Sequence, residues 1–151
     1  MEIVIEEIYN LIEAIMLAWF VTSYFKTNNK FQNKTAKLIV FTLIFIQINI
    51  VSILGLHWVF TLIISSVSLL GISTLLLKGT PSERIVISST AILLLALSDI
   101  CALTLIGKLL GIDYNELVAN NNFSRLLGVL TAKLLYIIAA SLILFFKKKY
   151  N

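Results

Sequence analysis

A single long apolar run near the C-terminal end constrains this chain more than any other feature. The run extends from Leu126 to Phe146 and contains one charged residue, Lys133. As a helix, its roughly 21 residues would be about 31 Å long, which matches the hydrocarbon thickness of a lipid bilayer. Because a backbone in lipid must satisfy its own hydrogen bonds, such a run can only be helical. We therefore predict a membrane span whose cytoplasmic end carries the basic triplet 147–149.

The composition agrees with an integral membrane protein. Hydrophobic residues make up 59% of the chain and charged residues 13%, and the mean hydropathy is +0.97. A soluble domain has about a quarter of its residues charged. The net charge of +4 comes from lysines and arginines at the ends of apolar runs, where they orient helices. We therefore exclude nucleic acid as a partner and expect the lipid bilayer instead.

Four further apolar runs precede this one, so the sequence predicts an all-α integral membrane bundle of about five spans in one domain, 1–151. The predicted spans are 8–25, 38–56, 59–77, 85–106 and 126–146, and the longest polar connection, 107–125, is an outer loop. The acidic first segment is the weakest of the five. Most basic residues fall on one side if the N-terminus lies outside, which predicts a cytoplasmic C-terminus.

Three ionisable residues lie inside the predicted spans: Glu13, Asp99 and Lys133. Counted from the outer ends of their spans, they share a depth of about 10 to 15 Å. A charge at such a position costs at least about 2.5 to 3.5 kcal/mol, so these side chains should face the bundle interior and pair. We predict that Lys133 pairs with Asp99 and that Glu13 lies close by. The cluster is either a ligand-binding site or a structural ion pair that fixes helix register.

The predicted outer loop holds further candidates for ligand contact. Residues 114–119 fit a short amphipathic helix on the outer surface. We hypothesise that the polar and charged side chains of this connection contact an extracellular ligand, namely Asp113, Tyr114, Glu116 and Arg125.

Other chemistries find less support in the residues. A glutamate in the first helix, here Glu13, is typical of small multidrug antiporters, but those chains have four helices. A membrane-embedded Cys/His peptidase would need His57 and Cys101 together, and nothing else in the chain matches one. A lone cysteine excludes an internal disulfide and fits a small packing residue. The sequence has no phosphate-binding or CxxC motif, so we expect no enzymatic activity, no cofactor and no metal.

The segment from Asn122 to Lys133, NFSRLLGVLTAK, is followed by an apolar helix with a basic end. It resembles the last transmembrane helix of AgrC-like receptor histidine kinases of Gram-positive bacteria, and the acidic first span and the lysine-rich loop after it are similar too. In that family the spans detect an extracellular signal, often a peptide. The last helix continues into a dimerisation helix with the phosphoacceptor histidine and a GHKL-type ATP-binding domain. The resemblance implies a sensor in the bacterial cytoplasmic membrane, a peptide or small-molecule ligand, and a homodimer.

The chain departs from this family at its end. It stops at Asn151, it has no ATP-binding motif, and its only histidine, His57, is predicted to lie outside. We expect no kinase activity and interpret the chain as the sensor part of a longer protein or as a free-standing membrane protein. The leading function is signal reception for a cytoplasmic module that this chain lacks. The alternatives are a small transporter or substrate-binding membrane subunit, and an accessory protein without a ligand.

Overall fold

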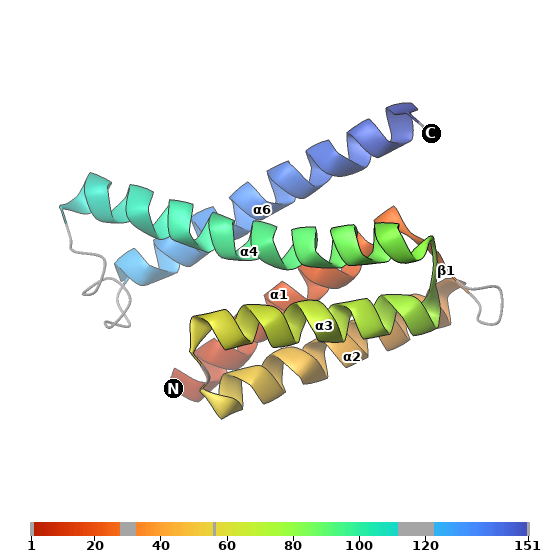
Figure 1. Ribbon diagram of the computed structural model, residues 1–151. Coiled ribbons are helices and arrows are strands. Elements are labelled where there is room, and N and C mark those ends of the chain that lie inside the picture. Colours follow the sequence, from red (N-terminus) through yellow and green to blue (C-terminus); the bar gives the residue numbers. More distant parts are fainter. Residues whose placement is uncertain (1, 28–32, 56, 112–122, 151) are drawn as a thin grey trace. The chain divides into compact units, whose positions relative to one another are not determined.

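The computed structural model describes residues 2–27, 33–55, 57–111 and 123–150. Within these ranges the chain forms five helices and two very short strands (Figure 1). The helices are α1 (Glu2–Tyr24), α2 (Asn33–Leu54), α3 (Trp58–Leu76), α4 (Pro81–Leu110) and α6 (Phe123–Tyr150). The strands are β1 (Lys26–Thr27) and β2 (Leu77–Lys78). The predicted all-α class is confirmed.

Four of the described helices are long and apolar enough to cross a membrane. Their candidate spans are Lys34–Leu54 in α2, Val59–Leu76 in α3, Pro81–Leu110 in α4 and Leu126–Lys149 in α6. The chain is thus a multi-pass membrane protein. Helix α1 covers all but the last residue of the first predicted span but is not one of these four, in keeping with its four glutamates. Its crossing of the membrane stays a prediction.

Helix α4 is longer than the predicted fourth span at both ends. It begins at Pro81 rather than at residue 85, and it ends at Leu110 rather than at residue 106. The first part of the predicted outer loop, 107–110, is therefore helical. Hydropathy marks where an apolar run ends, whereas the helix ends where a glycine adopts a left-handed conformation, here Gly111 with a φ of 66°.

Two other helices also start before their predicted spans. Helix α2 begins at Asn33 instead of residue 38, so its first turns carry the exposed Lys34 and Lys37. Helix α6 begins at Phe123 instead of residue 126. Polar residues at a membrane boundary continue the helical hydrogen bonds of the span, which is why helix length exceeds apolar length.

The chain divides into two compact units, Met1–Ile92 and Leu93–Asn151, and the boundary falls within α4. In the first unit α1 packs on α2, and α2 packs on α3. The second half of α1 buries a broad apolar face, whereas Ile8, Leu11, Ile15 and Trp19 are exposed on the other side. The buried side chains are Ala14, Met16, Leu17, Ala18, Phe20 and Val21. Protein rather than lipid therefore covers much of this helix, which suits a helix that also carries acidic residues.

The two strands connect the end of α1 to the end of α3. They pair antiparallel, with Lys26 opposite Lys78 and Thr27 opposite Leu77. The sequence predicts no strand at either place because two residues are too few to show an alternating pattern. The pairing holds the ends of α1 and α3 at one edge of the first unit.

In the second unit, α6 presents a buried face of mostly small residues. They recur at intervals of about four positions, as Gly128, Ala132, Tyr136 and Ala140. Such spacing places side chains on one side of a helix and allows close helix approach. Leucines on other faces of α6, such as Leu130 and Leu134, are exposed. This distribution suits a helix with lipid on one side and protein on the other.

Candidate functional site

The two intramembrane charges of the second unit meet in an ion pair. The Lys133 Nζ atom of α6 donates a hydrogen bond to the Asp99 Oδ1 atom of α4 over 3.1 Å. The lysine side chain is 8% exposed and that of the aspartate 37% exposed. The Lys133 side chain is therefore almost completely covered by protein, whereas the Asp99 side chain is partly exposed at the surface of the unit. A buried lysine of this kind depends on its partner for charge compensation.

Helix geometry explains why Lys133 points inward. It follows Ala132 and precedes Tyr136 by about one turn, so it lies beside the buried small-residue face of α6. On α4, Asp99 follows the buried Ser98. On each helix, the charged residue thus lies next to the face that is buried in protein.

Nearby hydroxyl groups satisfy themselves within their own helices. Ser98 donates to the Leu94 carbonyl over 2.8 Å, and Thr131 donates to the Leu127 carbonyl over 2.8 Å. These bonds engage the hydroxyl hydrogens with the backbone rather than with Asp99. Among the described residues, the Asp99 carboxylate therefore accepts its side-chain hydrogen bond from Lys133.

Glu13 and the candidates of the outer loop make up the remaining predicted site residues. Glu13 lies half-buried on α1 in the first unit, and its proximity to the pair stays a prediction. The candidates Asp113, Tyr114 and Glu116, and the predicted helix 114–119, lie outside the described residues. Arg125 lies in the first turn of α6, where only the backbone is described. The hypothesis of ligand contact by the outer loop is untouched by these observations.

A second polar seam, absent from the predicted sites, joins α1 to α2. Asn10 Nδ2 donates to Asn49 Oδ1 over 3.2 Å, and Ser52 Oγ donates to Glu6 Oε1 over 3.3 Å. The sequence signal was present: Glu6, Asn10 and Glu13 are four and three positions apart, which places them on one helix face. Such a face of polar residues in an apolar helix predicts a polar partner.

Gln47 of α2 is a further polar residue of the first unit. It shares a helix face with the buried Val40, Ile44 and Val51. Both polar atoms of its carboxamide are buried and have no hydrogen-bond partner among the described residues. Burying an amide without hydrogen bonds in a membrane span costs free energy. Gln47 therefore offers a donor and an acceptor inside the first unit that a bound polar group could satisfy.

Metal and peptidase chemistry gain no support. No group of three or more His, Cys, Asp or Glu residues that could hold a metal ion occurs within the part of the chain that the structure describes. His57 and Cys101 are both exposed, and they belong to different compact units.

No protein-family model, curated protein or solved structure matches this chain at a significant level. A functional assignment therefore rests on the ion pair, the polar seam and the membrane helices themselves.

Proposed function

We propose that the chain is a membrane-embedded sensor domain of the bacterial cytoplasmic membrane, oriented with its N-terminus outside and resembling the sensor regions of AgrC-like receptors. It would detect an extracellular peptide or small molecule and pass the signal to a cytoplasmic module. The observation that carries the proposal is the buried ion pair between Asp99 and Lys133, because it joins the helix that leads out of the membrane to its neighbour.

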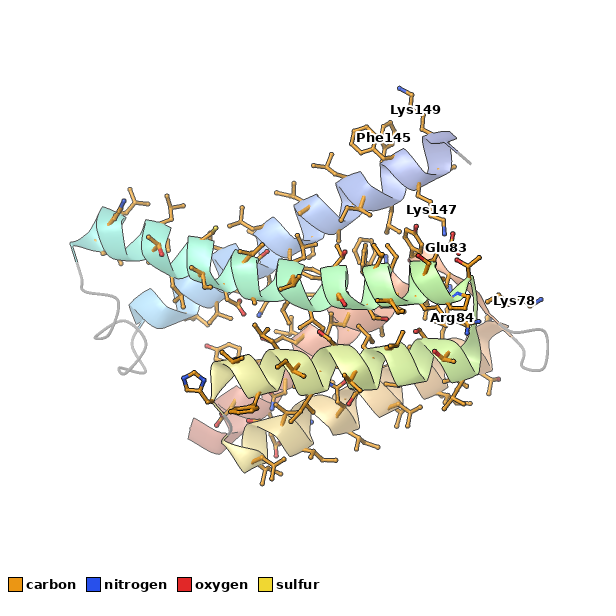
Figure 2. The ribbon with its side chains drawn as sticks, viewed as in Figure 1. Lys78, Glu83, Arg84, Phe145, Lys147 and Lys149 are labelled. Atoms are coloured by element: carbon orange, nitrogen blue, oxygen red, sulfur yellow. The ribbon has the colours of Figure 1, made fainter. Side chains whose placement is uncertain are left out.

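The length of α6 supports transmission. The helix runs without a break from Phe123 to Tyr150, a rigid element of about 42 Å. Lys133 lies in its first half, and Figure 2 shows Lys147 and Lys149 at its last turns. A displacement at the ion pair would therefore reach the basic end of the helix without passing through a hinge.

The ion pair gives α6 two definable arrangements, with the contact made or broken. A ligand can bias them only if it binds one arrangement more tightly than the other. A signal with its own charged group is well suited to this, since it could replace one partner of the pair. In a homodimer, which the resemblance implies, the same displacement would change how the two α6 helices enter the cytoplasm.

The test joins residues 1–151 in frame at Asn151 to the dimeric catalytic part of a histidine kinase, with linkers of successive lengths. Asp99→Asn and Lys133→Met should each change the basal rate of autophosphorylation. The two variants should do so in fusions with the same linker lengths. The matched control is Thr104→Ala, because Thr104 is exposed on the same helix as Asp99 and its hydroxyl donates to the Ile100 carbonyl of that helix. The same rate of autophosphorylation in all variants at every linker length would contradict the sensor proposal.

The alternative is a small transporter or substrate-binding membrane subunit, and the α1–α2 seam with Gln47 favours it. In that case the purified chain in vesicles should carry a solute or proton. A trapped pH-sensitive dye under an imposed pH gradient provides the readout, with Glu13→Gln as the variant and Thr42→Ala as its control. Proton flux that Glu13→Gln abolishes would favour transport over sensing.

A further inference from the structure

The ion pair of the second unit is accessible mainly from its negative side. The Asp99 side chain is 37% exposed, whereas the Lys133 side chain is 8% exposed. A molecule that approaches the pair therefore meets the carboxylate, while protein covers the ammonium. An anion at this point would be repelled by the carboxylate, and a cation would be attracted. The difference in burial thus fixes the sign of the charge that a ligand of this pair should carry.

The Asp99 carboxylate also has hydrogen-bonding capacity to spare. Within the described ranges, its Oδ1 atom accepts from Lys133 Nζ over 3.1 Å and its Oδ2 atom accepts no hydrogen bond. An ionised carboxylate can accept about four hydrogen bonds. The neighbouring hydroxyls of Ser98 and Thr131 donate to carbonyls of their own helices. Since lipid supplies no donors either, a ligand that brings its own N–H groups would gain from this oxygen.

The donor set favours a primary ammonium over other cations. A Ca²⁺ or Mg²⁺ ion needs several oxygen ligands, and no group of three or more potential metal ligands occurs in the described part of the chain. A guanidinium presents a planar fork that matches both oxygens of a carboxylate, yet Asp99 Oδ1 already accepts from Lys133. A primary ammonium binds one oxygen at a point and carries its donors with it.

The surface of α4 beside Asp99 is apolar. Ala96 lies about one turn before Asp99 and Leu103 about one turn after it, and both are half-buried. The adjacent Ile100 side chain is 51% exposed. A ligand whose ammonium contacts the carboxylate would therefore place the rest of its structure against apolar side chains. This surface favours an amphipathic amine over a hydrophilic one.

The depth of Asp99 leads to the same class of ligand. Asp99 lies 11 residues before Leu110, the last residue of α4, which is about 16 Å along the helix. The sequence predicts that this end of α4 faces outside. An ammonium at such a depth needs a counter-charge, which the carboxylate supplies. An apolar body keeps the remainder of the ligand in the lipid.

We propose that Asp99 binds the primary ammonium group of an amphipathic ligand, which takes the place of Lys133 as the partner of the carboxylate and lies with its apolar body along Ile100 and Leu103. The inference deepens the proposed sensor function and rests on it for the role of the ligand as a signal. The N-terminus of an apolar peptide and a long-chain amine share this chemistry.

Photolabelling of the purified full chain in phosphatidylcholine vesicles tests the site. The probe is dodecylamine with a diazirine in its chain, and the labelled positions are mapped by mass spectrometry. Excess dodecylamine should suppress labelling of α4 around Asp99 at a concentration at least about tenfold lower than dodecanol does, because an ammonium binds a carboxylate more strongly than a neutral hydroxyl does. Dodecanoate should not suppress it. Equal suppression by the three compounds would overturn the proposal, and this comparison needs only the wild type.

Two variants separate direct contact from a structural role. Asp99→Asn should weaken suppression by dodecylamine at least about tenfold, and Asp99→Glu should retain most of it. Lys133→Met should strengthen it severalfold, because the amine no longer competes with the lysine for the carboxylate. Both Asp99→Asn and Lys133→Met break the pair, so equal losses would mean that the intact pair, not the carboxylate, matters and would overturn the proposal.

Thr104→Ala is the matched control, since Thr104 is exposed on α4 and its hydroxyl donates to the Ile100 carbonyl. It should leave suppression by dodecylamine unchanged, and a loss equal to that of Asp99→Asn would contradict the site. If Asp99→Asn does not fold, the comparison of the three compounds on the wild type and the gain in Lys133→Met decide.

A further arm of the experiment identifies the source of the ammonium. An apolar pentapeptide of leucine and alanine with a free N-terminus is compared with its N-acetylated form, and only the free amine should suppress labelling. Suppression by the peptide at lower concentrations than by dodecylamine would assign the site to peptides, and the reverse order to long-chain amines. Equal suppression by the free and acetylated peptides would contradict ammonium recognition.

The labelling assay contains no kinase domain, so its outcome is separate from that of the sensor test. Saturable labelling at Asp99 without any change in the fused kinase would support the ammonium site and contradict the sensor. A fused kinase that responds to Asp99→Asn, together with an absence of saturable labelling by the amine, would overturn the ammonium site and leave the sensor proposal standing.

Discussion

The two compact units hold their polar groups within membrane helices in different ways. In the first unit, neutral groups pair between helices, as in Asn10 with Asn49 over 3.2 Å and Ser73 with Ser88 over 3.4 Å, and the Ser52 hydroxyl donates to the Glu6 carboxylate over 3.3 Å. The second unit pairs two full charges over 3.1 Å. A neutral hydrogen bond between membrane helices is worth about 0.6 kcal/mol on average, whereas loss of one partner of a buried ion pair costs about 3 to 5 kcal/mol. Among the described residues, the first unit thus has several weak polar contacts between helices, whereas the second has a stronger contact between two full charges.

The ion pair should give the largest effect of any single substitution. Asp99→Ala removes the carboxylate that accepts from the buried Lys133 ammonium, and we expect a loss of about 2 to 4 kcal/mol in the free energy of unfolding. This is less than the full penalty because Asp99 is partly exposed. Lys133→Ala leaves the more exposed partner and should cost about 1 to 2 kcal/mol. Denaturation of the purified chain in mixed micelles measures both.

The double variant Asp99→Ala/Lys133→Ala completes the cycle. It should recover part of the single losses, with a coupling above about 1 kcal/mol. Strictly additive losses would show that the two charges do not support each other. If Lys133→Ala costs more than Asp99→Ala, the difference in burial does not decide the outcome.

Packing should give the next largest effect, and it belongs to the first unit. A Cβ atom at Gly79 would lie 2.8 Å from Phe25 Cε1 and 2.9 Å from Phe25 Cδ1. The Phe25 ring is buried and packs edge-on against Tyr24, so it has little room to move. Gly79→Ala should therefore lower the free energy of unfolding by about 1 to 3 kcal/mol.

Gly71 of α3 is the matched control, since a Cβ atom there would have nothing within 4 Å. Gly71→Ala should raise the free energy of unfolding by about 0.5 to 1 kcal/mol through helix propensity. The double variant Gly79→Ala/Phe25→Leu should recover part of the stability that Gly79→Ala loses, because leucine at position 25 is smaller than phenylalanine. A neutral Gly79→Ala would show that the corner between α1 and α4 is loosely packed.

The cap of α4 should give a smaller effect. Thr80→Ala removes the hydroxyl that accepts from the Glu83 N–H and should cost about 1 kcal/mol in unfolding free energy. Ser82→Ala, at the exposed neighbouring position in the first turn, should be close to neutral. Equal effects of the two variants would mean that the capping box does not hold the helix start. The melting temperature of the purified chain measures both.

Sequence reasoning reached the parts of the structure that depend on hydropathy and charge. The pairing of Asp99 with Lys133 follows from two opposite charges at one depth on neighbouring spans, because lipid offers neither an alternative partner. The ends of α4 were missed, since Thr80 and Gly111 act through backbone hydrogen bonds rather than through hydropathy. The β1–β2 pair was missed because its strands are two residues long. The contact of Glu6 and Asn10 with α2 was missed as well. The spacing of these residues places them on one helix face, but hydropathy averaged along the chain does not reveal such a face.

The smallest expected effect tests the comparison most sharply, because it asks whether charge is the reason for the difference. Asn10→Ala and Asn49→Ala remove a neutral pair at nearly the same separation as the ion pair. Their double-mutant cycle should give a coupling of about 0.6 kcal/mol, below that of Asp99 with Lys133. Thr42→Ala serves as the control, since its exposed hydroxyl bonds to the Leu38 carbonyl of its own helix. If the two asparagines couple as strongly as Asp99 and Lys133, close polar contact rather than charge explains the coupling free energy of the ion pair.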